Sequence, residues 1–126
     1  MKLHADKPDS QTITAYGPGW VAVNGQRHAN SLLLSSGGPL LAWDCDRFEA
    51  LTAAHFEKLA TLGDETPELV VFGSGQRLRF VRPALLQSLM ARRIGVETMD
   101  TAAACRTFNI LAGEGRRVVA ALLIES

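Results

Sequence analysis

Residues 68–124 read ELVVFGSGQRLRFVRP, then ALLQSLMARRIGVETMDTAAACRTFNIL, then AGEGRRVVAALLI. The stretch opens with a continuous apolar run of the kind that forms a strand buried on both faces. A Gly-Ser-Gly loop follows, and two strand-helix steps come before an apolar closing strand. This alternation predicts an α/β domain whose units are joined by right-handed crossovers.

Three segments carry apolar residues at helical spacing and predict helices near residues 47–62, 83–94 and 101–112. The side chains expected to face the core share that spacing. They are Phe48, Leu51, His55, Leu59 and Leu62 in the first segment, Leu85, Leu86, Leu89 and Met90 in the second, and Ala104, Cys105, Phe108 and Leu111 in the third.

Each predicted helix also has a start signal. Asp46 precedes Glu49 by three residues, which is the capping-box pattern. Pro83 fits the first turn of the second helix, and Asp100 or Thr101 caps the third.

Glycines mark the predicted helix ends. Gly63 is expected to supply a left-handed stop after the first helix. Gly95 and Gly113 are expected to end the second and the third.

The N-terminal third predicts an antiparallel β meander. Its expected strands are Thr12–Tyr16, Trp20–Val23, Ser31–Ser36 and Leu40–Trp43, and Asn24-Gly25 is a strong hairpin signal. We therefore expect one α/β domain over residues 12–126, with an N-terminal antiparallel β portion, preceded by a loose arm over residues 1–11.

Composition narrows the class of protein. A chain of 126 residues forms one domain and buries roughly two thirds of its unfolded surface. Lys+Arg and Asp+Glu each number 13, so no net field attracts nucleic acid or a membrane. No apolar run approaches the ~20 residues of a membrane span. We expect a soluble, cytoplasmic protein with no nucleic-acid partner and no membrane insertion.

Charge is uneven within the chain. Between Gly73 and Arg117 there are eight arginines and three acidic residues, an excess of five positive charges. Arginine presents a planar fork that suits carboxylates and phosphates. The excess is also what a GC-rich genome produces without selection for binding, and the sequence leaves both interpretations open.

The Gly73–Gly75 loop imitates a dinucleotide-binding fingerprint, because Glu97 ends the next strand at a fitting distance. Two features oppose that interpretation. Leu78 occupies the third glycine position, and the next helix begins only near Pro83. A small ligand or anion at this loop and a plain tight turn remain the alternatives.

Cysteine catalysis and metal binding are not expected. Cys45 lies between Asp44 and Asp46, whose charges oppose formation of a thiolate, and Cys105 lies at a core position. His55 lies on an apolar stripe, and the three histidines have no paired spacing. We predict two reduced, unpaired cysteines, no catalytic residue, no metal and no cofactor.

A cleft is the remaining candidate site. If the strands ending at Phe72 and Met99 are parallel neighbours, Gly73–Gly75 lies beside Asp100–Thr101, where open α/β sheets hold ligands. The candidate ligand-binding residues are Gly73, Ser74, Gly75, Arg77, Asp100, Thr101, Asn109 and Arg116. The alternative is capping plus a salt bridge at the helix end, in which Asn109 and Arg116 only satisfy backbone groups and brace the turn.

The order of these motifs resembles a known family. The matching residues are Gly73 and Gly75, Thr101, Ala104, Asn109 and the turn 114–117. Together they resemble the small α/β domain of an adipogenesis-associated protein and of a mitochondrial respiratory complex I assembly factor, over residues 20–123. The resemblance implies a three-layer α/β fold with a mixed central sheet and a cleft near the Gly-x-Gly loop. It implies no established reaction.

Two functional hypotheses of different class follow. The first is a non-enzymatic interaction module with a protein partner, assisting the assembly of a membrane-associated complex. The second is a protein, an enzyme included, that binds a small molecule or anion in the cleft. Fold alone does not decide between them.

Overall fold

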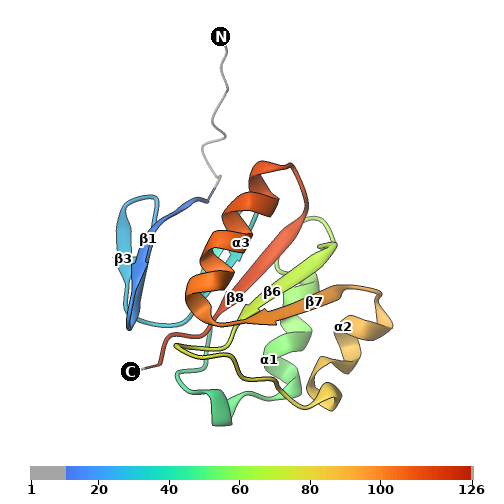
Figure 1. Ribbon diagram of the computed structural model, residues 1–126. Coiled ribbons are helices and arrows are strands. Elements are labelled where there is room, and N and C mark those ends of the chain that lie inside the picture. Colours follow the sequence, from blue (N-terminus) through green and yellow to red (C-terminus); the bar gives the residue numbers. More distant parts are fainter. Residues whose placement is uncertain (1–10, 126) are drawn as a thin grey trace.

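A five-stranded mixed sheet forms the centre of the computed structural model, which describes residues 11–125 (Figure 1). Its order is β5-β4-β8-β6-β7. The strands are β4 (Leu32–Ser35), β5 (Leu40–Ala42), β6 (Leu69–Gly73), β7 (Gly95–Met99) and β8 (Val118–Leu122). Strand β6 runs parallel to β7 and β8, whereas β4 is antiparallel to β5 and β8. The α/β class and the mixed sheet are confirmed.

Strand β8 is buried along its whole length because both faces of the sheet are covered. Val119 and Ala121 belong to one core cluster, and Val118, Ala120 and Leu122 belong to the other. Successive side chains of a strand point to opposite faces, so an uninterrupted apolar sequence is what a central strand between two cores requires.

Helix α3 (Thr101–Gly113) covers one face of the sheet, and α1 (Ala53–Glu57) with α2 (Gln87–Ala91) covers the other (Figure 1). The first two predicted helices are each divided by 3-10 turns. These turns are η1 (Phe48–Ala50), η2 (Lys58–Thr61) and η3 (Pro83–Leu86). The three-layer arrangement is confirmed.

The N-terminal strands divide between two sheets, contrary to the single meander that was predicted. Strands β1 (Ile13–Gly17), β2 (Trp20–Val23) and β3 (Gln26–His28) form a separate antiparallel sheet. Asn24 and Gly25 have φ of 51° and 85°, so the predicted hairpin is confirmed. This sheet buries its apolar side chains in the same core cluster as α3.

The predicted capping box at Asp46 and Glu49 is wrong. The chain makes only the short turn η1 there, and α1 starts later, with Thr52 and His55 as the reciprocal pair. The Thr52 amide donates to His55 Nδ1 at 2.9 Å, and His55 Nε2 lies 2.7 Å from the Asp44 carbonyl oxygen. Phe56 occupies the core position in this segment and is fully buried, although it was not among the predicted core residues.

The predicted helix ends also need correction. Gly63 does not have the left-handed φ that was predicted for it. Helix α2 ends at Ala91, four residues before Gly95, and the left-handed residue that follows it is Arg93, with φ of 59°. The Ile94 amide then donates to the Leu89 carbonyl at 2.9 Å, which closes a Schellman-type end. The predicted core residue Met90 is 55% exposed.

No helix within residues 11–125 is long and apolar enough to cross a membrane. The arm predicted for residues 1–11 lies, apart from Gln11, outside the described residues.

Candidate functional site

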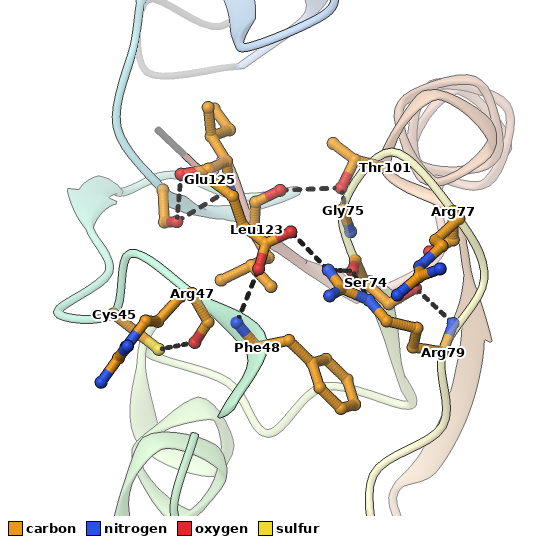
Figure 2. Close-up of polar contacts among 12 residues, drawn as sticks. Cys45, Arg47, Phe48, Ser74, Gly75, Arg77, Arg79, Thr101, Leu123 and Glu125 are labelled. Carbon is orange, nitrogen blue, oxygen red and sulfur yellow. Dashed lines mark hydrogen bonds and ion pairs between the residues drawn. The ribbon is translucent and has the colours of Figure 1, made fainter. Parts of the chain in front are cut away.

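The Gly73–Gly75 loop adjoins the start of α3, because β6 and β7 are parallel neighbours as the cleft hypothesis required. The Thr101 amide donates to the Gly75 carbonyl at 2.8 Å, and the Gly75 amide donates to Thr101 Oγ1 at 2.9 Å (Figure 2). Thr101 Oγ1 in turn donates to the Leu123 carbonyl at 2.9 Å. One threonine therefore joins the loop, the helix and the segment after β8.

Both glycines of the loop are required by close packing. A Cβ on Gly73 would lie 2.9 Å from Thr101 Cα and 3.1 Å from Ala104 Cβ. Gly75 has φ of +108°, and a Cβ there would meet the Arg79 guanidinium. The glycines that imitate a dinucleotide fingerprint thus allow contact between protein segments.

Ser74 is fully buried and holds the loop by both its backbone and its side chain. Its amide donates to the Met99 carbonyl at 2.8 Å. Its hydroxyl donates to the Arg77 carbonyl at 2.8 Å and accepts from the Arg79 amide at 2.9 Å. Its hydrogen-bonding groups serve the fold of the loop.

Arg79 and Glu125 form an ion pair that the sequence did not reveal (Figure 2). Arg79 also donates to the Ser74 carbonyl, and its guanidinium lies 4.6 Å from the centre of the Phe48 ring. Glu125 Oε2 accepts from the Phe48 amide at 2.8 Å. The pair therefore connects the loop, the C-terminal segment and η1.

The environment of Glu125 lowers its pKa. Burial raises the pKa, and this is the largest single effect. Hydrogen bonds from Arg79 and the Phe48 amide, with the charges of Arg79 and Arg77, together outweigh it. Glu125 is thus a carboxylate at neutral pH.

A cavity of about 300 Å³ lies between the β1–β2 turn and the start of α3. Its lining residues are Tyr16, Gly17, Pro18, Gly19, Trp20, Val21, Gly75, Gln76, Asp100, Thr101, Ala102, Leu123, Ile124 and Glu125. Of the eight candidate ligand-binding residues, Gly75, Asp100 and Thr101 line it. Gly73, Ser74 and Arg77 belong to the adjoining loop.

Two candidates lie elsewhere. Asn109 accepts from the Ile13 amide at 3.0 Å and donates to the Ile13 carbonyl at 2.7 Å, so it fastens β1 to α3. Arg116 pairs with Glu68 at 3.4 Å, at the end of the sheet where β8 begins. Neither residue is among those that line the cavity.

Asp100 contributes a carboxylate to the cavity and also caps α3. Its Oδ1 accepts from the Ala103 amide at 2.8 Å. Arg106, on the same helix, donates to the Tyr16 hydroxyl at 3.0 Å and so ties the β1–β2 hairpin to α3. Asp100 and Glu125 are the only charged residues among those that line this cavity within the described chain.

Both cysteines are free and buried. Burial raises the pKa of Cys45 most; a hydrogen bond with the Arg47 backbone lowers it, and the charges of Asp46 and Asp44 raise it further. Burial raises the pKa of Cys105 to about 12. Neither thiol is therefore activated as a nucleophile. Residues 11–125 hold no group of three His, Cys, Asp or Glu side chains fit for a metal ion.

This arrangement, a mixed sheet between helical layers with the Gly-Ser-Gly loop fastened to α3, defines a known class of protein. Residues 13–123 match the family described as "Protein of unknown function (DUF498/DUF598)". The chain belongs to that family.

Two solved structures show the same fold at appreciable sequence identity. A crystal structure from Bordetella parapertussis is 39% identical, with a TM-score of 0.87, and covers 95% of this chain and 100% of that one. A solution structure from Bordetella pertussis, described as an Mth938-like domain, is 35% identical, with a TM-score of 0.79, and covers 100% of this chain and 94% of that one.

A relative with a named role is the bovine (Bos taurus) protein "NADH dehydrogenase [ubiquinone] 1 alpha subcomplex assembly factor 3", which is 32% identical over 121 residues. The match covers 96% of this chain and 65% of the bovine protein. The chain therefore spans slightly less than two thirds of that relative's length.

Proposed function

We propose that this protein is an interaction module that serves as an assembly or accessory factor for a membrane-associated complex. The bovine relative, an assembly factor by name, supports a protein partner for this chain. The matched segment spans nearly the whole of this chain, so the shared domain is the part that would bind that partner.

The observation that carries this proposal is a pair of exposed apolar side chains on a fastened loop. We call residues 76–82 the 76–82 loop. Phe80 is 70% exposed and Leu78 is 52% exposed, although Arg79 between them is held by Ser74 and Glu125. Aromatic side chains that lie exposed on a rigid element are typical anchors of protein interfaces.

Affinity capture from native cells tests the interaction module. The bait is the full chain, compared with a Leu78→Ala/Phe80→Ala variant. Ile110→Ala is the matched control, because Ile110 is 61% exposed but lies on α3. We expect a stoichiometric partner that the double variant loses and the control retains. Equal recovery with both variants at unchanged melting temperature would contradict the proposal.

The cavity favours a second candidate function, the binding of a small molecule. Its volume is at the lower end of the ~300–1,000 Å³ of ordinary ligand pockets. An anion is the less favoured ligand, because Asp100 and Glu125 contribute two carboxylates to the lining and Asp100 already caps the start of α3. Arg79, the cation beside Glu125, is already paired.

Fragment binding followed by amide NMR tests the second candidate. Shifts at Gly75, Thr101 and Ile124 that Ala102→Leu abolishes would support it, since Ala102 lines the cavity. Ala91→Leu, at an exposed position on α2, is the control. Inorganic phosphate should not raise the melting temperature, and a clear rise that depends on Thr101 would favour the anion.

A further inference from the structure

From Leu78 to Arg82, the side chains of the 76–82 loop alternate between solvent and the protein. Arg79 points inward to Ser74 and Glu125, and Val81 packs against the core cluster that contains Phe72. Such alternation resembles that of a strand, in which neighbouring side chains point opposite ways. Leu78 and Phe80 accordingly face solvent.

In this loop a charged side chain is partly buried and an apolar side chain is exposed, which is the reverse of the usual arrangement. The side chain of Arg79 is only 17% exposed and is kept inside by Glu125, while the neighbouring phenylalanine is 70% exposed. A hydrogen-bonded ion pair thus fixes the backbone that presents the apolar side chains. Such a surface is ordered before binding, which lowers the entropy lost when a partner docks.

The charge around the exposed apolar pair is positive. Residues 69–96 contain five arginines and no acidic residue. Arg77 and Arg82, at either side of the apolar pair, are exposed and form no ion pair within residues 11–125, whereas Arg79 is neutralised by Glu125. In the sequence, two exposed arginines that form no ion pair among the described residues therefore flank Leu78 and Phe80.

We propose that the 76–82 loop docks onto an acidic protein surface containing an apolar pocket. Phe80 enters the pocket with Leu78 beside it, and Arg77 and Arg82 pair with carboxylates at the rim. Arginine suits this role because its planar fork binds a carboxylate through two hydrogen bonds. This inference rests on the proposed interaction module and adds the chemistry of the partner.

An anionic membrane is the less favoured occupant. Electrostatic attachment to such a membrane generally takes clusters of about 4–8 basic residues. The loop supplies two free arginines, and the adjoining helix α2 (Gln87–Ala91) has only five residues. An apolar pocket with a few carboxylates fits two aromatic or aliphatic side chains and two guanidinium groups better.

Selection from a random 16-residue peptide library displayed on phage tests which chemistry the loop binds. The bait is the full chain, beside Phe80→Ala and the charge-reversed variant Arg77→Glu/Arg82→Glu. Lys58→Glu/Arg92→Glu is the matched control, because it makes the same change in charge at exposed positions outside the loop. Thermal melting verifies that each bait is folded.

Peptides enriched by the unmodified chain should be acidic and contain aromatic or large aliphatic residues. Their affinity should fall about tenfold or more with Phe80→Ala, as for an anchor residue, and should weaken as salt is added. The variant Arg77→Glu/Arg82→Glu should select basic peptides instead, and Lys58→Glu/Arg92→Glu should keep the acidic preference.

Several results would overturn the inference. One is that the unmodified chain selects basic or uncharged peptides, or no peptides at all. Enrichment that survives Phe80→Ala would also contradict the inference, as would an unchanged preference after charge reversal in the loop. Sedimentation with phosphatidylglycerol vesicles but not phosphatidylcholine vesicles, lost with Phe80→Ala, would assign the loop to a membrane. If the cellular partner requires Phe80 but not Arg77 and Arg82, the interaction module stands and only the acidic character of the partner fails.

Discussion

Single residues at the candidate site are constrained chiefly by contacts between segments of the fold. Gly73 has no left-handed φ, yet Thr101 and Ala104 leave no room for its Cβ. Thr101 Oγ1 accepts a hydrogen bond from the Gly75 amide and donates one to the Leu123 carbonyl. A Gly-x-Gly loop can therefore be a packing device even where its spacing imitates a dinucleotide-binding motif.

Gly73→Ala should lower the free energy of unfolding by about 1–3 kcal/mol, because the added methyl group overpacks the contact with Thr101. Gly113→Ala provides the contrast, since nothing lies within 4 Å of a Cβ there. That change should be neutral or should stabilise α3 by up to about 1 kcal/mol. Urea denaturation of both variants measures the difference, and equal stability would refute the packing argument.

Both thiols should react slowly in the native protein at pH 8. Cys45 is 8% exposed and Cys105 is fully buried, and burial is the main cause that raises the pKa of each. A colorimetric thiol reagent should modify Cys45 before Cys105, and denaturation without reductant should release two thiols. Rapid native modification of Cys105 would contradict the described packing.

Elements far apart in the chain meet at the C-terminal segment that follows β8. Leu123 and Glu125 contact the start of α3, the 76–82 loop and η1. The loop has no helix or strand of its own, so its shape depends on Arg79 and on the segment to which Arg79 binds. The exposed face of the loop therefore depends on the docking of the C-terminal segment.

Glu125→Gln should make the free energy of unfolding less dependent on pH in acid. The carboxylate's pKa lies below its ordinary value of 4.5 in the folded state, because its hydrogen bonds and the nearby arginines outweigh burial. A depressed pKa stabilises the fold above the unfolded pKa, and that stabilisation is lost as the pH falls from about 4.5 through the folded value. Chemical denaturation between pH 7 and pH 3 measures the slope.

Glu49→Gln is the control for this pH dependence. Glu49 is exposed and forms no ion pair within residues 11–125. This control should follow the unmodified protein in acid. If Glu125→Gln shows the same acid slope as the unmodified protein, the ion pair does not contribute to stability in solution.

The whole molecule is two sheets that share one helix. The central sheet is packed on both faces, whereas the β1–β3 sheet contacts the rest mainly through α3 and its neighbouring core. Strand β8 lies between β4 and β6, so residues near positions 35, 69 and 118 must come together before the centre forms. Such non-local pairing is characteristic of folds with a high contact order.

Amide hydrogen exchange should follow this arrangement. Strands β6 and β8 should be the slowest, because each has a paired strand on both sides and both faces buried. The edge strands β5 and β7 should exchange faster, as should β3, whose residues are largely exposed. Protection of β3 equal to that of β8 would mean that the small sheet unfolds only with the core.

Elements that depend on local chemistry could be predicted from the sequence. The Asn24-Gly25 hairpin follows from two residues that tolerate positive φ, and the apolar runs at 69–73 and 118–122 specified buried strands. The proximity of Gly75 and Thr101 could also be predicted, because the carboxyl ends of neighbouring parallel strands lie at the same edge of a sheet. Ligand binding at that edge stays a prediction.

Contacts between distant residues became apparent only in three dimensions. Arg79 and Glu125 are 46 positions apart, and Asn109 and Ile13 are 96 apart, so no local pattern links them. Tertiary packing also placed the helix start at Thr52 and His55, because both ring nitrogens of His55 find backbone partners there and Phe56 then fills the core. Local patterns report propensity, but the partner of each polar side chain is set by which segments pack together.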